Sequence, residues 1–261
     1  MRHNTQKLEL EANYTWSHEF DDEVNVFAGF EDPLDPKYDR GSGDWDVRQN
    51  FTLSGVYNLP DFKGSRRLMQ ETVGGWQAST IVQTRSGLAQ NVEVTSGFFG
   101  NYMRPNVVPG VPVKLSNVSW PSLTYNPAAY ALEPGFDGVW GDPSTIGTVP
   151  RNSIRGPEYF QWDLSGMKNF AIAEGVKLQF RADIFNILNH PNFSNIDTGI
   201  CSAVSYPSAT SAVCTPNTRR LQQNGFWEGF GTSSATVAGA DGSQIGNGTA
   251  RQAQFSLKVI F

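Results

Sequence analysis

Strict alternation of apolar and polar residues is the feature that most limits what this chain can fold into. Between residues 7 and 17 every even position is apolar, from Leu8 to Trp16, and every odd position is polar. The last eleven residues are as regular, with Ala253, Phe255, Leu257, Val259 and Phe261 on one parity. A period of two sends successive side chains to opposite faces of a β-strand. The sequence therefore predicts an all-β protein built from two-faced strands.

The same alternation occurs near residues 47–59, 76–85, 159–170 and 176–184. These stretches are about ten residues long, which exceeds the usual length of globular strands and matches a tilted membrane strand. Their polar positions hold mainly Gln, Ser, Thr and Asn, whereas a face in bulk water typically carries more Lys and Glu. We therefore predict an antiparallel transmembrane β-barrel fragment of about six long strands, which by itself forms an open, curved sheet.

The links between the strands alternate in length. Links 18–46, 87–157 and 186–250 are long, whereas 60–74 is shorter and 173–175 is a tight turn. Outer-membrane barrels place long loops outside the cell and short turns in the periplasm. We therefore expect long extracellular loops. Aromatic residues near the strand ends would form two interfacial girdles: Tyr14, Trp16, Phe160 and Trp162 outside, and Tyr57, Trp76, Phe170, Phe180 and Phe261 inside.

Composition and motifs exclude several classes of protein. The chain of 261 residues has 20 basic and 25 acidic residues and no basic stripe, so no nucleic-acid partner is expected. Three histidines and two cysteines lack zinc-ligand spacing, and no GxSxG, HExxH or P-loop motif occurs. We expect no catalytic residues, no metal site and no cofactor. Residues 1–20 lack the apolar core of a signal peptide, so either the protein is not exported or the chain begins inside a longer one.

Two loop segments carry chemistry that could be structural or functional. The stretch 31–46 holds Asp32, Asp35, Asp39, Asp44 and Asp46, whose oxygens suit calcium but whose spacing fits no EF-hand. We expect a solvated external loop there. The Ser/Thr-rich segment 198–248 is expected to be a mobile external loop. Its Cys201 and Cys214 could form a disulfide in an oxidising compartment or remain two free thiols.

Further side chains are given structural roles. Arg181 and Asp183 share one strand face and are expected to form a salt bridge. The aromatic residues of the long links are expected to pack the loops on one another rather than grip a sugar or a peptide. These aromatics are Tyr102, Trp120, Tyr125, Tyr130, Phe136, Trp140 and Trp227.

Five segments resemble the C-terminal barrel of TonB-dependent outer-membrane receptors. They are GDWDVRQNFTLSGVYNLP (43–60), GGWQASTIVQTRSG (74–87), RNSIRGPEYFQWDLSGMKNF (151–170), VKLQFRADIFNILNHPNF (176–193) and RQAQFSLKVIF (251–261). The likeness is to the Oar-like group, which has a carboxypeptidase-regulatory-like N-terminal domain, and FRADIFNILNHPNF is its most specific piece. Barrels of this family have about 22 strands. The resemblance implies that residues 1–261 are the C-terminal part of such a barrel, without the plug and N-terminal domains.

The resemblance also implies a location and partners. It places the chain in the bacterial outer membrane, in the TonB-dependent uptake of a ligand such as an oligosaccharide, a peptide or a metal chelate. The implied partners are outer-membrane lipid, the rest of the barrel with its plug, the TonB complex, and the barrel-assembly machinery. That machinery would read Phe255, Leu257, Val259 and Phe261, whereas the ligand-binding residues stay unassigned. Two alternatives remain: a secreted soluble β-sandwich that binds carbohydrate, and an adhesive or structural outer-membrane barrel.

Overall fold

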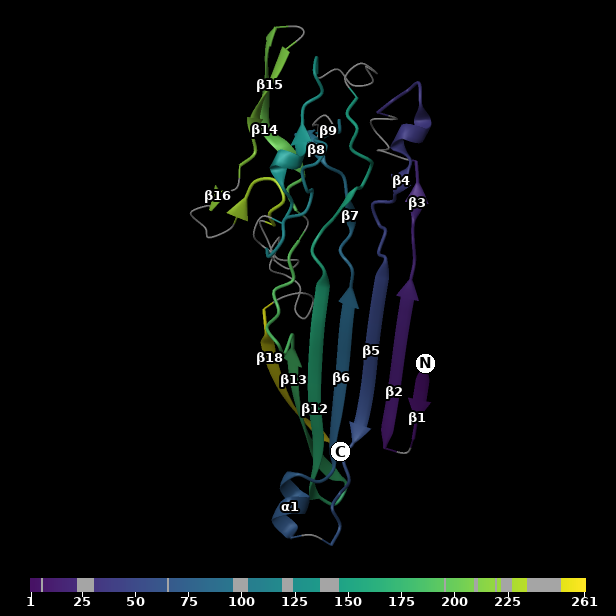
Figure 1. Ribbon diagram of the computed structural model, residues 1–261. Helices are drawn as coiled ribbons and strands as arrows, with labels where there is room; N and C mark the ends of the chain where they lie inside the picture. The colour runs from purple at the N-terminus through teal and green to yellow at the C-terminus, as the bar shows by residue number, and fades with distance from the viewer. Residues whose placement is uncertain are drawn as a thin grey trace.

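Six long strands and one short strand form a single antiparallel sheet in a computed structural model of the chain (Figure 1). The sheet order is β1 (Arg2–Asn4), β2 (Leu8–Trp16), β5 (Gln49–Asn58), β6 (Trp76–Arg85), β12 (Tyr159–Ala173), β13 (Val176–Phe185) and β18 (Gln252–Ile260). The structure describes residues 1–5, 7–22, 31–64, 66–95, 103–118, 124–136, 146–194, 196–208, 211–218, 220–221, 227–233 and 250–261. The six long strands fall where the alternation predicts them.

One edge of the sheet differs from the sequence prediction. In an open sheet of the six predicted strands, the first strand (near residues 7–17) and the last (251–261) are the expected edges, but β1 pairs with the first through Arg2 opposite Glu11 and Asn4 opposite Glu9. Because β1 is short, it and the preceding Met1 cover β2 only as far as Ala12, and the remainder of β2 stays at the edge. The opposite edge is β18, as predicted. Among the described strands, no pairing joins β18 to β1 or β2, so the sheet is open.

The register gives the sheet two chemically distinct faces. Directly opposed residues in antiparallel strands share a face, and the pairs Leu178 with Val259 and Phe180 with Leu257 are both apolar. The pairs Asp183 with Gln254 and Gln179 with Lys258 are both polar. The two faces predicted from period two are therefore confirmed, and Arg181 and Asp183 form the predicted salt bridge on the polar face, at 2.8 Å.

Polar atoms on the apolar face find partners within the sheet. The Trp162 indole N–H donates to Thr80 Oγ1 at 2.7 Å, and the Thr80 hydroxyl donates to the Asp163 carbonyl at 3.1 Å. Unpaired polar groups would be costly on a surface in contact with lipid. The apolar face thus carries a tryptophan and a threonine without an unpaired donor at either side chain.

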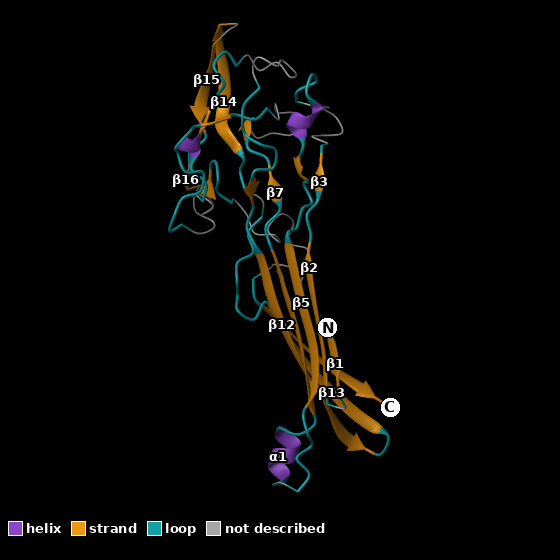
Figure 2. Ribbon diagram, turned by 45° about the vertical axis from the view of Figure 1, so that its right-hand side comes forward, coloured by secondary structure: helices purple, strands orange, loops and turns teal. Residues whose placement is uncertain are grey.

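A short helix, α1 (Arg67–Thr72), lies at the end of the sheet where the links are short (Figure 2). The buried Lys168 extends from the apolar face to this helix, where its ammonium group donates to the Glu71 carbonyl at 2.5 Å. The Trp76 indole N–H donates to the Thr72 carbonyl at 2.8 Å. At the same end, Gly175 takes a φ of 78° in the tight turn between β12 and β13. No helix in the described ranges is long and apolar enough to cross a membrane.

The three long links come together at the other end of the sheet and form a structure that we call the cap (Figures 1 and 2). Its elements are β3 (Phe20–Asp21), η1 (Pro36–Asp39), β4 (Gly41–Ser42), β7 (Ala89–Gln90), β8 (Glu93–Thr95), β9 (Asn106–Val107), η2 (Pro127–Ala129), β10 (Tyr130–Ala131), β11 (Ile154–Arg155), β14 (Gly199–Ser208), β15 (Ser211–Pro216), β16 (Arg220–Leu221) and β17 (Trp227–Glu228).

The hydrophobic core of the described chain lies in the cap and not in the sheet. It contains Val92, Val94, Met103, Tyr125, Ala129, Tyr130, Phe136, Val149, Ile154, Ile196, Ile200, Cys201 and Phe230. Tyr125, Tyr130 and Phe136 therefore pack the loops together, as predicted, and Tyr130 meets the Phe230 ring edge-on at 5.3 Å. Tyr102, Trp120 and Trp140 lie outside the described residues, as does the side chain of Trp227.

The segment expected to be a mobile loop is instead ordered in its first part. Strands β14 and β15 form a hairpin, and β14 also pairs in parallel with β8. A disulfide joins Cys201 to Cys214, the first of the two alternatives that the sequence left open. Cys201 is buried in the cap core, so the disulfide fastens the hairpin to that core. Residues 234–249 lie outside the described part of the chain.

Candidate functional site

A line of linked polar side chains runs along the polar face of β12 toward the cap. The guanidinium carbon of Arg85 lies 5.1 Å from the centroid of the Tyr159 ring. The Tyr159 hydroxyl donates to Gln161 Oε1 at 2.5 Å, and Gln161 donates to both oxygens of Asp163 at 2.9 Å. Asp163 also accepts the Asn186 backbone N–H at 2.8 Å. The buried Gln161 thus fixes Tyr159, and Tyr159 in turn orients Arg85.

A pocket of about 320 Å³ opens where this line meets the cap. It is lined by Arg85, Ser86, Gly87, Leu88, Pro157, Tyr159, Phe193 and Ser194. The volume is at the lower end of the range of small-molecule sites, roughly 300–1,000 Å³. The lining combines one cation and two hydroxyl-bearing serines with aromatic and aliphatic surface, a mixture that suits a ligand with both apolar and charged parts.

Two glycines allow the walls of this pocket to meet. A Cβ added to the buried Gly87 would lie 1.9 Å from the carbonyl oxygen of Gly156, so no other residue fits without moving the backbone. Beside this crossing, the Gly156 N–H donates to the Leu88 carbonyl at 2.9 Å, and β7 pairs with β11. One wall of the pocket is therefore formed where the backbone segments at Gly87 and Gly156 cross closely and are joined by hydrogen bonds.

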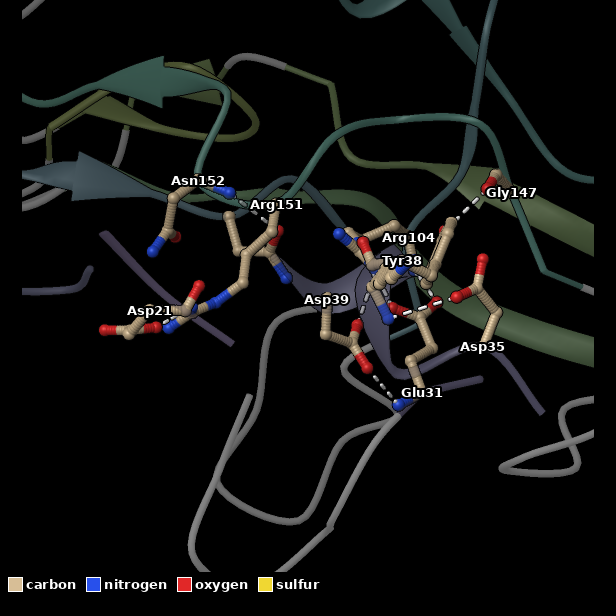
Figure 3. Close-up of polar contacts among 11 residues, drawn as sticks. Asp21, Glu31, Asp35, Tyr38, Asp39, Arg104, Gly147, Arg151 and Asn152 are labelled. Atoms are coloured by element: carbon tan, nitrogen blue, oxygen red, sulfur yellow. Dashed lines mark hydrogen bonds and ion pairs between the residues drawn. The ribbon is translucent and has the colours of Figure 1, made fainter. Parts of the chain in front are cut away.

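Above the sheet, a buried arginine joins distant segments of the cap (Figure 3). Arg104 Nε donates to Glu31 Oε2 and Arg104 Nη2 donates to Asp39 Oδ1, both at 2.7 Å, and the three side chains are at most 1% exposed. The guanidinium carbon lies 3.9 Å from the centroid of the Tyr38 ring. The Tyr38 hydroxyl donates to the Gly147 carbonyl at 2.5 Å. The Arg104 side chain and the Tyr38 ring stacked on it thus hold residues 31–39 in contact with the segments around residues 104 and 147.

A second arginine joins the first long link of the cap to the second (Figure 3). Arg151, whose side chain is 4% exposed, forms ion pairs with Asp21 and, at 3.4 Å, with Asp44. The neighbouring Asn152 donates to Asp44 Oδ1 at 2.7 Å and to the Ser42 carbonyl at 2.7 Å. Residues 130 positions apart in the chain are therefore joined directly.

Asp46 is the acceptor of a third network. It pairs with Arg155 at 2.5 Å and with Arg48 at 2.7 Å, and it accepts the Glu19 N–H at 2.9 Å. Burial alone would raise the pKa of Asp46, but these hydrogen bonds, of which that from Arg155 is the largest, outweigh burial and lower its pKa to about 2. Asp46 therefore stays ionised and holds both arginines at neutral pH.

Other carboxyl groups of the cap are shifted in the opposite direction. Burial raises the pKa of Glu31 and of Asp39, and the charge of Arg104 opposes both shifts. Burial also raises the pKa of Glu93 to about 8, followed by repulsion from Glu31, Asp44 and Asp197. Among the described residues no cation offsets this burial, so Glu93 is protonated over much of the neutral range.

The prediction of a solvated acidic loop is wrong for two of its five aspartates. Asp39 and Asp46 are 0% and 1% exposed, because arginines from distant segments reach them. Asp32 and Asp35 serve as local turn acceptors for the N–H groups of Leu34 and Lys37, and Asp44 is exposed. Within the described ranges, no group of three or more His, Cys, Asp or Glu side chains could hold a metal ion.

The residues predicted to form the barrel-assembly signal lie on the edge strand and just beyond it. Phe255, Leu257 and Val259 are 69%, 68% and 48% exposed on the apolar face of β18, and Phe261 follows the strand. The structure thus leaves these side chains accessible along an unpaired edge. Recognition by the assembly machinery stays a prediction.

Comparison with known proteins identifies the family. A family model described as an outer membrane beta barrel domain matches residues 1–223, which include five of the six long strands. The chain belongs to this family. No curated protein and no solved structure matches the chain. The outer membrane beta barrel domain is located in the bacterial outer membrane, so its apolar face lies toward lipid, its polar face toward the lumen, and its cap outside the cell.

Membership of this family excludes the soluble β-sandwich. A sandwich buries the inner faces of two sheets, whereas Tyr14, Trp16 and Leu257 of this sheet are all more than 60% exposed. Exposed apolar side chains of this kind are stable in contact with lipid. The pocket by Arg85 then lies at the outer mouth of the lumen, below the cap.

The sequence predicts no ligand-binding residue, and Arg85, Gly87 and Arg104 become visible as site residues only in the structure. The GGWQASTIVQTRSG segment does contain a signal for Arg85, because Arg85 is the last residue of a two-faced strand and its charged side chain lies on the polar face. Nothing local distinguishes Arg104, whose partners are more than 60 residues away.

Proposed function

We propose that the chain is the C-terminal part of a TonB-dependent receptor barrel that takes up a ligand through the outer membrane. The observation that carries this proposal is the pocket at the mouth of the lumen, walled by an ordered cap and facing a polar sheet surface. A receptor needs such a pre-formed external site, because ordering mobile loops on binding would reduce its affinity. The five segments that resemble receptor barrels support the same proposal.

The open sheet supports the view that more strands complete the barrel. Unpaired backbone N–H and C=O groups in lipid cost several kcal/mol each, so β18 and the free half of β2 must pair in the membrane. The six long strands are fewer than the roughly eight of the smallest bacterial barrels. In this proposal, strands and a plug encoded before residue 1 close the barrel and provide the TonB contact. The chain performs no catalysis in this role.

In vivo crosslinking tests the proposal without a known ligand. The full-length protein is expressed in its own host, and formaldehyde-crosslinked complexes are probed for TonB in wild-type cells and in cells that lack the inner-membrane proteins energising TonB. We expect a crosslink to TonB. In a variant with a cysteine placed in the plug, we expect maleimide to label that cysteine only when the TonB complex is energised. A protein that neither crosslinks to TonB nor changes its labelling is an adhesive or structural barrel instead.

A further inference from the structure

We infer that the pocket at the lumen mouth binds a sugar that carries a carboxylate, with the guanidinium of Arg85 holding the carboxylate and Phe193 contacting the sugar ring. The inference rests on the proposed uptake function for its biological meaning, but the binding itself is measured without transport. It names the chemical class of ligand that the sequence left open.

Arg85 is a cation without a counterion in the described part of the chain. Within that part the Arg85 side chain makes no ion pair and no hydrogen bond, unlike the side chains of Arg104, Arg151 and Arg155, and it is exposed to the pocket. The residues directly opposite it on the polar face are Asn50 and Tyr159, neither of which is acidic. The charge of Arg85 is therefore available to a ligand.

The surroundings of Arg85 prepare its guanidinium for a planar anion. The guanidinium lies over the Tyr159 ring at 5.1 Å, and the Tyr159 hydroxyl is fixed by Gln161. Arginine on an aromatic face keeps its N–H edge free, and that edge matches the two oxygens of a carboxylate. The nearest acid along the line, Asp163, is already satisfied by Gln161 and Asn186.

The rest of the pocket suits a sugar ring. Phe193, Leu88 and Pro157 provide apolar surface for the C–H faces of a pyranose, and Ser86 and Ser194 provide hydroxyl groups near its edge. Aromatic rings commonly contact the apolar face of a ligand whose polar edge stays in contact with water. A neutral sugar would fit the same surface but would leave the charge of Arg85 unpaired, and so the site favours a uronic acid.

Equilibrium binding to the purified full-length protein in detergent tests the inference. The probes are digalacturonate and, as the neutral match, digalactose, measured by calorimetry at low and high salt. We expect digalacturonate to bind at least about 10-fold more tightly than digalactose, with the difference shrinking as salt rises. Arg85→Gln should weaken digalacturonate binding about 10- to 100-fold and leave digalactose unchanged.

Matched variants separate the pocket from general charge effects. Arg181→Gln removes an arginine from the same lumen face but outside the pocket, and it should leave binding unchanged. Tyr159→Phe keeps the ring under Arg85 but removes the hydroxyl bond to Gln161, so it should weaken binding less than Tyr159→Ala, which removes the ring as well. Equal affinity for the two probes, or an Arg85→Gln variant that binds as the wild type does, overturns the inference.

The two proposals can fail separately. Selective digalacturonate binding in a protein that never contacts TonB would leave the ligand assignment standing and refute the uptake function. A TonB crosslink in a protein that does not discriminate between the probes would do the reverse.

Discussion

At the scale of single residues, the cap is held by buried charges whose partners lie far away in the chain. The ionised form of a buried carboxylate is stable only when a cation and hydrogen bonds compensate for lost water. Arg104 compensates Glu31 and Asp39, and Arg155 with Arg48 compensates Asp46. Among the described residues no cation compensates Glu93, so burial raises the pKa of Glu93, whereas the hydrogen bonds to Asp46 lower the pKa of that carboxyl group.

Removal of Arg104 should destabilise the cap strongly. Arg104→Met leaves Glu31 and Asp39 buried without a cation, which costs about 3–5 kcal/mol for a buried pair. Protease cleavage of the cap in intact cells measures the effect, with the exposed Arg67–Glu71 pair as the control. Arg67→Met should change cleavage little, since water screens an ion pair between exposed side chains. Equal cleavage of the two variants would contradict a central role of Arg104.

Substitution of Glu93 should stabilise the cap increasingly as the pH rises from 4.5 to 8. Its folded-state pKa of about 8 exceeds the ordinary value of 4.5, so the stabilising effect of its proton is complete below pH 4.5 and is lost as the pH rises through 8. Glu93→Gln removes this loss, and we expect a gain that grows from almost none at pH 4.5 to about 4 kcal/mol at pH 8. Hydrogen exchange of the β8 amides at both pH values measures it. A gain that does not depend on pH would refute this assignment.

At the scale of elements, the long strands are defined by their two faces and the cap hairpin by its disulfide. In the described sheet the last strand, β18, has no neighbour on one side, so its side chains report directly on which face meets lipid. A shift of one residue would turn every polar side chain of β18 into hydrocarbon.

An arginine on each face of β18 distinguishes lipid from lumen. Leu257 lies in mid-strand on the apolar face, opposite Phe180, and Leu257→Arg should cost about 2–4 kcal/mol near the membrane midplane. Gln254 lies opposite Asp183 on the polar face, so Gln254→Arg gains an acidic neighbour and should cost much less. Refolding titrations of the full-length protein into lipid vesicles compare the two. Equal costs would mean that the faces are assigned wrongly.

Loss of the disulfide should loosen the cap hairpin without unfolding the sheet. Cys201 and Cys214 are 13 positions apart, and a loop of this size contributes about 3 kcal/mol by restricting the unfolded chain. We expect the double variant Cys201→Ala with Cys214→Ala to exchange the β14 and β15 amides faster, while those of β12 and β13 are unchanged. Thiol labelling of unreduced wild-type cells is the control, and two reactive thiols would show that the disulfide does not form in the cell.

At the scale of the whole molecule, a single-layer sheet carries a cap that contains the hydrophobic core. This division follows from the two solvents, because lipid covers the apolar face of the strands while the cap must bury its own apolar residues from water. The core therefore lies in the links, where a soluble protein would have its surface loops.

The open sheet predicts the behaviour of residues 1–261 expressed by themselves. Long unpaired edges invite pairing between molecules, so we expect self-association in detergent and no cooperative unfolding transition. Size-exclusion chromatography and circular dichroism in detergent and in buffer measure both properties. A monodisperse, cooperatively unfolding monomer that needs no detergent would contradict both the open sheet and the receptor proposal.

The sequence by itself determined the six long strands, their two faces and the end of the sheet that carries the long links. Each of these follows from a local rule, since a period of two fixes the faces of a strand without reference to any other segment. The tertiary structure alone decided that Asp39 and Asp46 are buried, that the hairpin from Gly199 to Pro216 is ordered, and that Arg85 lies beside a pocket. These outcomes depend on contacts such as that between Arg104 and Glu31, 73 positions apart, and no local pattern encodes which distant residue will supply the compensating charge.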